Sequence, residues 1–213
     1  MPQNLLLLFE LLGTVAFALS GAMVALSKKM DIFGVAVLGL VTAVGGGVIR
    51  DLVLGITPPA TFKNPVYATV AIIVSVAAFV PAIRRFLFAK PGLYDKFLLL
   101  MDSIGLGIFT VVGIETAYIA GHSSSWFLLI FVGVITGCGG GILRDILAQN
   151  TPAVLVKHFY ASASIIGAVV CILLWKLWGQ SAAIIGGAFS VLVLRLLAAK
   201  YQWSLPKPEN DFE

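Results

Sequence analysis

Long apolar blocks follow one another along almost the whole chain, and this feature limits the fold more than any other. From Leu5 to Lys200 they recur with lengths of about 20 residues and few charged side chains. Of the 213 residues, 60% are apolar and 11% are charged, against roughly 45–50% and 25% in soluble domains. A soluble core of this size does not hide so many blocks from water, so the sequence predicts an integral membrane protein.

Seven blocks are long enough to cross a bilayer as helices. They cover residues 5–26, 32–54, 66–83, 97–119, 126–148, 159–177 and 180–199. These blocks are apolar on all sides, whereas the strands of a membrane barrel alternate apolar and polar residues, so the predicted fold class is all-α. The first block lacks a Lys/Arg-rich start and carries Glu10, so we expect it to be retained as a helix rather than cleaved as a signal peptide. We expect the tail at 201–213 to be largely disordered.

The distribution of cations predicts the orientation of the chain. With seven spans, and with Arg50 and Arg144 set aside, ten cations fall on the side that holds the C-terminus: Lys28, Lys29, Arg84, Arg85, Lys90, Lys96, Lys157, Arg195, Lys200 and Lys207. The other side has Lys63 and Lys176. The N-terminus is therefore expected outside and the C-terminus in the cytoplasm. Because the positive charge sits between apolar blocks, it orients the chain, and no nucleic-acid partner is expected.

An internal repeat divides the chain. Residues 39–51 read GLVTAVGGGVIRD and residues 133–145 read GVITGCGGGILRD, with seven identical positions. Upstream of each copy an acidic residue, Glu10 or Asp102, is followed by Gly, Phe and Gly at the same spacing. We expect two three-helix units, 1–90 and 91–178, a seventh helix at 179–200 and a cytoplasmic tail. An odd number of spans per unit inverts the second copy, as in many transporters and some channels.

The triple glycines allow two interpretations. Three consecutive glycines cost a helix about 1 kcal/mol each relative to alanine, so something must compensate. One interpretation is a kink or unwound turn that exposes carbonyl oxygens to a cation path, and the other is close helix packing through small residues. Two threonines nearby could offer hydroxyls to an ion or bond their own backbone. The candidate residues are Gly45, Gly46, Gly47, Gly139, Gly140, Gly141, Thr42 and Thr136.

Charged residues follow each triple glycine, and at membrane depth they need partners. Repeat alignment and topology favour the pairs Glu10–Arg50 and Asp102–Arg144, while each arginine has an alternative partner in the next residue of the chain. These next residues are Asp51 and Asp145. A partner from a neighbouring subunit is a further alternative. The pairs would act either as a latch that fixes helix packing or as part of a gate.

Other chemistry-bearing residues are sparse. Glu115, without an acidic counterpart in the first unit, is either interfacial or a cation-attracting carboxylate at a pore mouth. Cys138 and Cys171 lie inside apolar blocks and are expected to be packing residues. His122 and His158 have no second ligand at helical spacing, so no metal site is expected. We find no catalytic constellation and expect no enzyme activity and no cofactor other than permeant K⁺ or Na⁺.

The paired GGGVIRD and GGGILRD, set in inverted three-helix units with a seventh helix, resemble the TRIC family of trimeric intracellular cation channels, in its prokaryotic branch. Prokaryotic relatives also carry the label of a glycine transporter domain. The resemblance covers nearly all of residues 5–200. It implies a homotrimer in the lipid bilayer, an hourglass pore within each subunit, potassium and less selectively sodium as permeants, and kinks at both triple glycines. It also implies lipid at the trimer interface, although no basic pocket is assigned from this chain.

The function expected from the sequence is therefore a potassium-permeable channel for monovalent cations in a prokaryotic inner membrane. The alternative is a secondary transporter for a small zwitterion such as glycine, and a third possibility is a non-conducting membrane subunit. Animal members of the family link voltage response to a basic residue in the fourth helix. Residues 101–118 contain no Lys or Arg, so voltage gating by that route is not expected.

Overall fold

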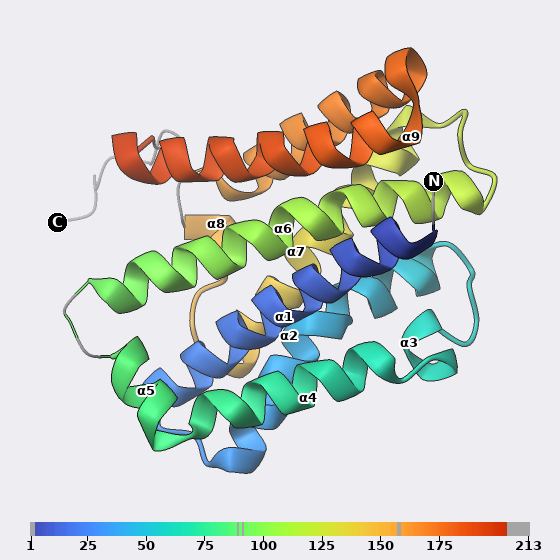
Figure 1. The fold of residues 1–213 in the computed structure, drawn as a ribbon. Coiled ribbons are helices and arrows are strands. Elements are labelled where there is room, and N and C mark those ends of the chain that lie inside the picture. Colours follow the sequence, from blue (N-terminus) through green and yellow to red (C-terminus); the bar gives the residue numbers. More distant parts are fainter. Residues whose placement is uncertain (1–2, 89, 91, 157–158, 204–213) are drawn as a thin grey trace, which may run out of the picture.

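The chain forms a bundle of apolar helices (Figure 1). The structure is a computed structural model, and it describes residues 3–88, 90, 92–156 and 159–203. Five of its helices are long and apolar enough to cross a membrane: α1 (Gln3–Ser27), α2 (Ile32–Val53), α6 (Leu93–Ile119), α7 (Trp126–Leu147) and α9 (Tyr160–Tyr201). The described residues contain no strand. The predicted all-α, multi-pass membrane fold is confirmed.

Four shorter helices complete the described chain: α3 (Ala60–Lys63), α4 (Val66–Phe79), α5 (Pro81–Leu87) and α8 (Ala153–Val156). The sequence predicted one span at 66–83, but the helix that begins at Val66 ends at Phe79, so the predicted extent is wrong. Val80 has ψ 131°, outside the helical range, because a residue before proline is disfavoured in the α conformation. The 14 residues of α4 extend about 21 Å, less than the roughly 30 Å of a bilayer core.

Helix α9 consists of two antiparallel halves that turn at Gly179. This residue has φ 82° and ψ −177°, a conformation that is essentially confined to glycine. The halves then pack on each other: a Cβ added to Gly187 would lie 2.7 Å from the Cβ of Cys171. Figure 1 shows the orange and red parts of α9 side by side. The separate blocks expected at 159–177 and 180–199 correspond to these halves.

Two further boundaries differ from the expectation. Helix α6 begins at Leu93 rather than near residue 97. Tyr201 still belongs to α9, and Trp203 packs edge-on against Phe159 at 5.7 Å between ring centroids, so the first residues of the expected disordered tail are part of the bundle. Residues 204–213 of that tail, and Lys157 and His158, lie outside the described residues.

The helices lie in layers, with α4 on one flank, α1 and α2 next, then α6 and α7, and α9 on the other flank (Figure 1). Small side chains dominate the buried positions, so the helices approach closely. Cys138 and Cys171 are free thiols that are 1% and 0% exposed within these packed clusters. Their predicted role as packing residues is confirmed.

Candidate functional site

Helices α2 and α7 cross at their triple glycines, and both remain α-helical through them. The unwound turn expected at Gly45–Gly47 and Gly139–Gly141 is therefore absent, and this expectation was wrong. Its physical alternative, close packing, explains Gly46 and Gly140. A Cβ on Gly46 would overlap the carbonyl oxygen of Thr136, and a Cβ on Gly140 would overlap that of Thr42. A bend of the helix axes at these positions stays a prediction.

The order of these two contacts gives the direction of the crossing. Gly46 follows Thr42 in α2, but its partner Thr136 precedes Gly140 in α7. The helices are therefore antiparallel, and the Arg-Asp pairs that follow each triple glycine lie at opposite ends of the bundle.

Thr42 and Thr136 use their hydroxyls locally. Each donates a hydrogen bond of 2.6 Å to a carbonyl oxygen of its own helix, that of Leu38 or Val132. The same hydroxyls abut Gly21 of α1 and Gly113 of α6, where a Cβ would come within 2.5 Å. The backbone bond considered for these threonines is present, and a role toward a permeating ion stays a prediction.

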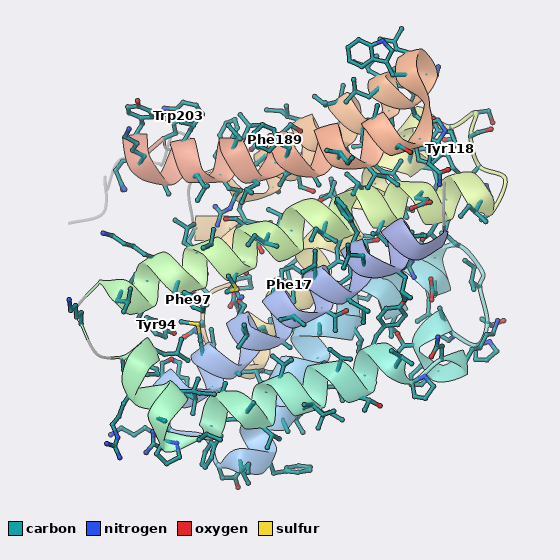
Figure 2. All side chains as sticks on the ribbon, in the orientation of Figure 1. Phe17, Tyr94, Phe97, Tyr118, Phe189 and Trp203 are labelled. Atoms are coloured by element: carbon teal, nitrogen blue, oxygen red, sulfur yellow. The ribbon has the colours of Figure 1, made fainter. Side chains whose placement is uncertain are left out.

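A pair of phenylalanines lies beside the glycine crossing. The rings of Phe17 and Phe109 are 5.3 Å apart between centroids, and Phe17 is 1% exposed in the middle of the bundle (Figure 2). Phe17 also lies 3.6 Å from the position of a Cβ on Gly140. Sequence reasoning aligned these residues but gave them no role, although each stands seven positions after the acidic residue of its unit.

The Arg-Asp pairs form the same structure twice. Arg50 Nε donates to Asp51 Oδ1 at 2.8 Å, and Arg144 Nε donates to Asp145 Oδ1 at the same distance. The second oxygen of each aspartate accepts a backbone N–H from the short helix that follows, Ala60 at 2.7 Å or Ala153 at 2.8 Å. Each aspartate thereby neutralises its neighbour and fixes the loop that returns to the bundle.

The predicted pair Asp102–Arg144 is confirmed. Arg144 Nη1 lies 2.6 Å from Asp102 Oδ1 and donates to Ser20 Oγ at 2.5 Å. Asp102 Oδ2 lies 3.7 Å from a second guanidinium, that of Arg195 in α9. All of these charged side chains are buried, so the mutual neutralisation is needed to hold them inside the bundle.

The predicted pair Glu10–Arg50 is wrong. Glu10 accepts a hydrogen bond from the hydroxyl of Tyr67 in α4, while Arg50 binds Asp51. Both arginines bind the aspartate next to them, but among the described residues only Arg144 also binds an acid across the bundle. Sequence reasoning missed Tyr67. Its signal was a tyrosine at the start of the third helix of each unit, Tyr67 in α4 and Tyr160 in α9.

Glu115 is 2% exposed and therefore buried within the bundle. Its Oε1 accepts a hydrogen bond from Nε2 of Gln180, the residue after the turn of α9. A role at a pore mouth stays a prediction. His122 lies between α6 and α7, and the described residues hold no group of three potential metal ligands.

Two cavities flank the glycine crossing. One, here called the Glu10 cavity, has a volume of about 60 Å³ and is lined by Glu10, Thr14, Ala43, Val44, Gly47, Arg50, Ala60, Thr61, Tyr67, Phe109 and Val112. The other, here called the Arg144 cavity, has a volume of about 170 Å³ and is lined by Val24, Ser27, Tyr94, Leu98, Arg144, Asp145, Asn150, Thr151 and Ala153. Figure 2 labels Tyr94 at the end of the bundle near α5. Polar cavities thus lie at opposite ends of α2 and α7, with packed glycine and phenylalanine between them.

Sequence comparisons place the chain among bacterial membrane proteins. A family model described as "Glycine transporter" matches residues 7–82 and 99–176. A UPF0126 membrane protein of Vibrio cholerae is 42% identical over 97% of this chain and 84% of its own length. The UPF0126 inner membrane protein YadS of Escherichia coli is 37% identical over 92% of this chain and 93% of its own length.

Solved structures share the fold along the whole bundle. A structure of a TRIC cation channel is 40% identical, with a TM-score of 0.83, and covers 95% of this chain and 96% of the other. The TRIC orthologue from Rhodobacter sphaeroides, a trimeric intracellular cation channel, is 34% identical with a TM-score of 0.84 and covers 93% and 99% of the two chains. The chain belongs to the TRIC family of membrane proteins, to which the matched glycine transporter model is related.

Proposed function

We propose that the protein is a channel for monovalent cations, permeable to potassium, with a path through each subunit. The observation that carries this proposal is the pair of polar cavities at opposite ends of antiparallel helices α2 and α7. The path runs from the Glu10 cavity, past Phe17 and Phe109, to the Arg144 cavity. In this conformation it is closed, because the glycine crossing and the two rings are packed without space between them.

The path lies between two inverted three-helix units. The first comprises α1, α2 and α4, and the second comprises α6, α7 and the first half of α9, with the second half of α9 as the seventh helix. The contacts at Gly46 and Gly140, the paired Arg-Asp bonds and the two segments matched by one family model support this division. In residue numbers the units are 1–90 and 91–178, followed by the helix at 179–200.

The proposed assembly is a homotrimer in the cytoplasmic membrane of a prokaryote, with the N-terminus outside and the C-terminus inside. Related structures are described as trimeric intracellular cation channels, and a relative is named as an inner membrane protein. The orientation rests on the ten-to-two distribution of cations along the sequence.

A carrier for a small zwitterion is the second candidate. The Glu10 cavity presents both a carboxylate and a guanidinium, the two groups that would meet an ammonium and a carboxylate. Both are already engaged, however: Glu10 by Tyr67 and Arg50 by Asp51. A glycine molecule would have to displace these bonds, so we favour the channel.

Recordings from purified protein in planar bilayers separate the two candidates. A channel gives discrete unitary currents in potassium salt, whereas a carrier gives saturable glycine uptake without unitary currents. The variant Phe17→Ala should raise the current or the open probability, because it removes one of the two rings that fill the path. Phe131→Ala is the control, since Phe131 is 46% exposed on the outside of α7. If Phe17→Ala behaves like this control, the path does not pass the rings.

A further inference from the structure

The Glu10 cavity carries a net negative charge. Its lining includes one carboxylate, Glu10, and one guanidinium, Arg50. The guanidinium is matched by Asp51, whose Oδ1 lies 2.8 Å from Arg50 Nη2. Together these three groups leave one negative charge without a cation to balance it, and this charge is on Glu10.

The opposite end of the proposed path is balanced. Two guanidinium groups, Arg144 and Arg195, contact two carboxylates there. Asp102 lies between both arginines, and Asp145 binds Arg144 at 2.8 Å. A passing ion therefore meets no net charge from this cluster, so discrimination by charge falls to the other cavity.

The surroundings of Glu10 preserve its negative charge and strengthen the electric field of the carboxylate. Its hydrogen-bond donor, the phenol of Tyr67, is neutral and leaves the negative charge in place. Ala43, Val44 and Val112 add apolar walls to the small cavity. Low-dielectric walls around one sign of charge focus the field and raise the local concentration of counter-ions.

We propose that Glu10 is the residue that makes the path prefer cations to anions. This inference rests on the channel function proposed above and deepens it. Repeat alignment obscures the difference between the two ends, since it equates Glu10 with Asp102. Asp102 is matched by two guanidinium groups, whereas Glu10 is matched by none within salt-bridge distance among the described residues.

A purely structural role for Glu10 has a different signature. In that case the carboxylate only ties α1 to α4 through Tyr67, and its charge is incidental. Glu10→Gln distinguishes the two roles, because the amide oxygen still accepts the phenol's hydrogen bond but the charge is gone. Tyr67→Phe is the reciprocal variant, because it removes the bond and keeps the charge.

The test is the reversal potential of single channels in planar bilayers under a KCl gradient. We expect Glu10→Gln to lower the K⁺/Cl⁻ permeability ratio on the order of ten-fold, at the lower end of the enrichment that a charged cleft produces. Arg50→Gln should raise the ratio, because it leaves Asp51 as a second uncompensated carboxylate. Tyr67→Phe should keep the ratio. Asp95→Asn is the matched control, since it removes an exposed carboxylate from the first turn of α6, outside the cavity.

The outcomes separate this inference from the proposed function. If wild-type protein conducts and Glu10→Gln keeps its ion preference, the inference is wrong and the channel stands. The inference also fails if Tyr67→Phe loses the preference as fully as Glu10→Gln, or if only Glu115→Gln loses it. If wild-type protein gives no unitary currents, both proposals fall. Opposite changes of the K⁺/Cl⁻ permeability ratio in Glu10→Gln and Arg50→Gln support the inference. A general folding defect would not change the ratio in opposite directions in the two variants.

Discussion

Alanine substitutions at two adjacent residues should have opposite effects on stability. Gly46 and Gly47 are neighbours in α2, but only Gly46 faces the crossing with α7. A Cβ at Gly46 would overlap the backbone carbonyl of Thr136, whereas a Cβ at Gly47 would meet nothing closer than Arg50 Nη2 at 3.8 Å. Gly140 repeats the Gly46 contact from the other helix, against the carbonyl of Thr42.

The expected magnitudes follow from two terms. Both substitutions gain up to about 1 kcal/mol of helix propensity. Only Gly46→Ala carries a steric term, which is typically about 1–3 kcal/mol for an overpacked core. We use the upper end of this range, because the opposing atom is a backbone oxygen, which cannot move away by a change of side-chain rotamer. We therefore expect Gly47→Ala to be as stable as wild type or up to about 1 kcal/mol more stable, and Gly46→Ala to be about 2 kcal/mol less stable.

The measurement is unfolding of the purified protein in mild detergent, followed by circular dichroism as a denaturing detergent is added. Gly140→Ala should match Gly46→Ala. The double variant Gly46→Ala/Gly140→Ala should cost less than the sum of the two, because one separation of the helices relieves both contacts. Equal stability of Gly46→Ala and Gly47→Ala would refute the close crossing. Conductance should fall together with stability, because the added Cβ atoms crowd the path at the crossing.

Three further substitutions or labels test other parts of the structure. Arg144→Ala should cost about 3–5 kcal/mol in the same unfolding assay, because it strips Asp102 of its closest partner, and adding Asp102→Asn should recover part of that loss; simply additive losses would contradict the pair. Gly179→Ala should cost about 1–3 kcal/mol, because alanine is strained at φ 82°, and an unchanged midpoint would show that the turn tolerates a side chain. Cysteines placed at Gln3 and Asn210 should react with impermeant reagents from opposite sides of the membrane, and labelling from one side would refute seven crossings.

The helices were largely predictable because their signal is local. A stretch of apolar residues needs no knowledge of its neighbours to indicate a membrane helix. The turn of α9 was also visible, because Gly179 interrupts two apolar blocks. The end of α4 was not, since the apolar pattern continues across Val80 and Ile83, and only the backbone restriction before Pro81 breaks the helix.

The triple glycines show that one sequence pattern can have more than one physical cause. A broken helix and a close crossing both require residues without side chains. The sequence contains no information on which atom lies opposite each glycine, and that atom decides the matter. At Gly46 it is the Thr136 carbonyl of an intact helix, so the cost of glycine is offset by backbone packing rather than by an ion.

Arg195 exposes the assumption that limited the prediction of charge pairs. Repeat alignment assigned one acid to one arginine, and Arg195 was counted only among the cations that orient the chain. A carboxylate has two oxygens, and in the structure Oδ1 of Asp102 faces Arg144 while Oδ2 faces Arg195. The second half of α9 has no counterpart in the repeat, so no alignment could place its arginine. Because that half contacts only one of the two acids that the repeat equates, the two ends of the bundle differ in charge even though their motifs are the same.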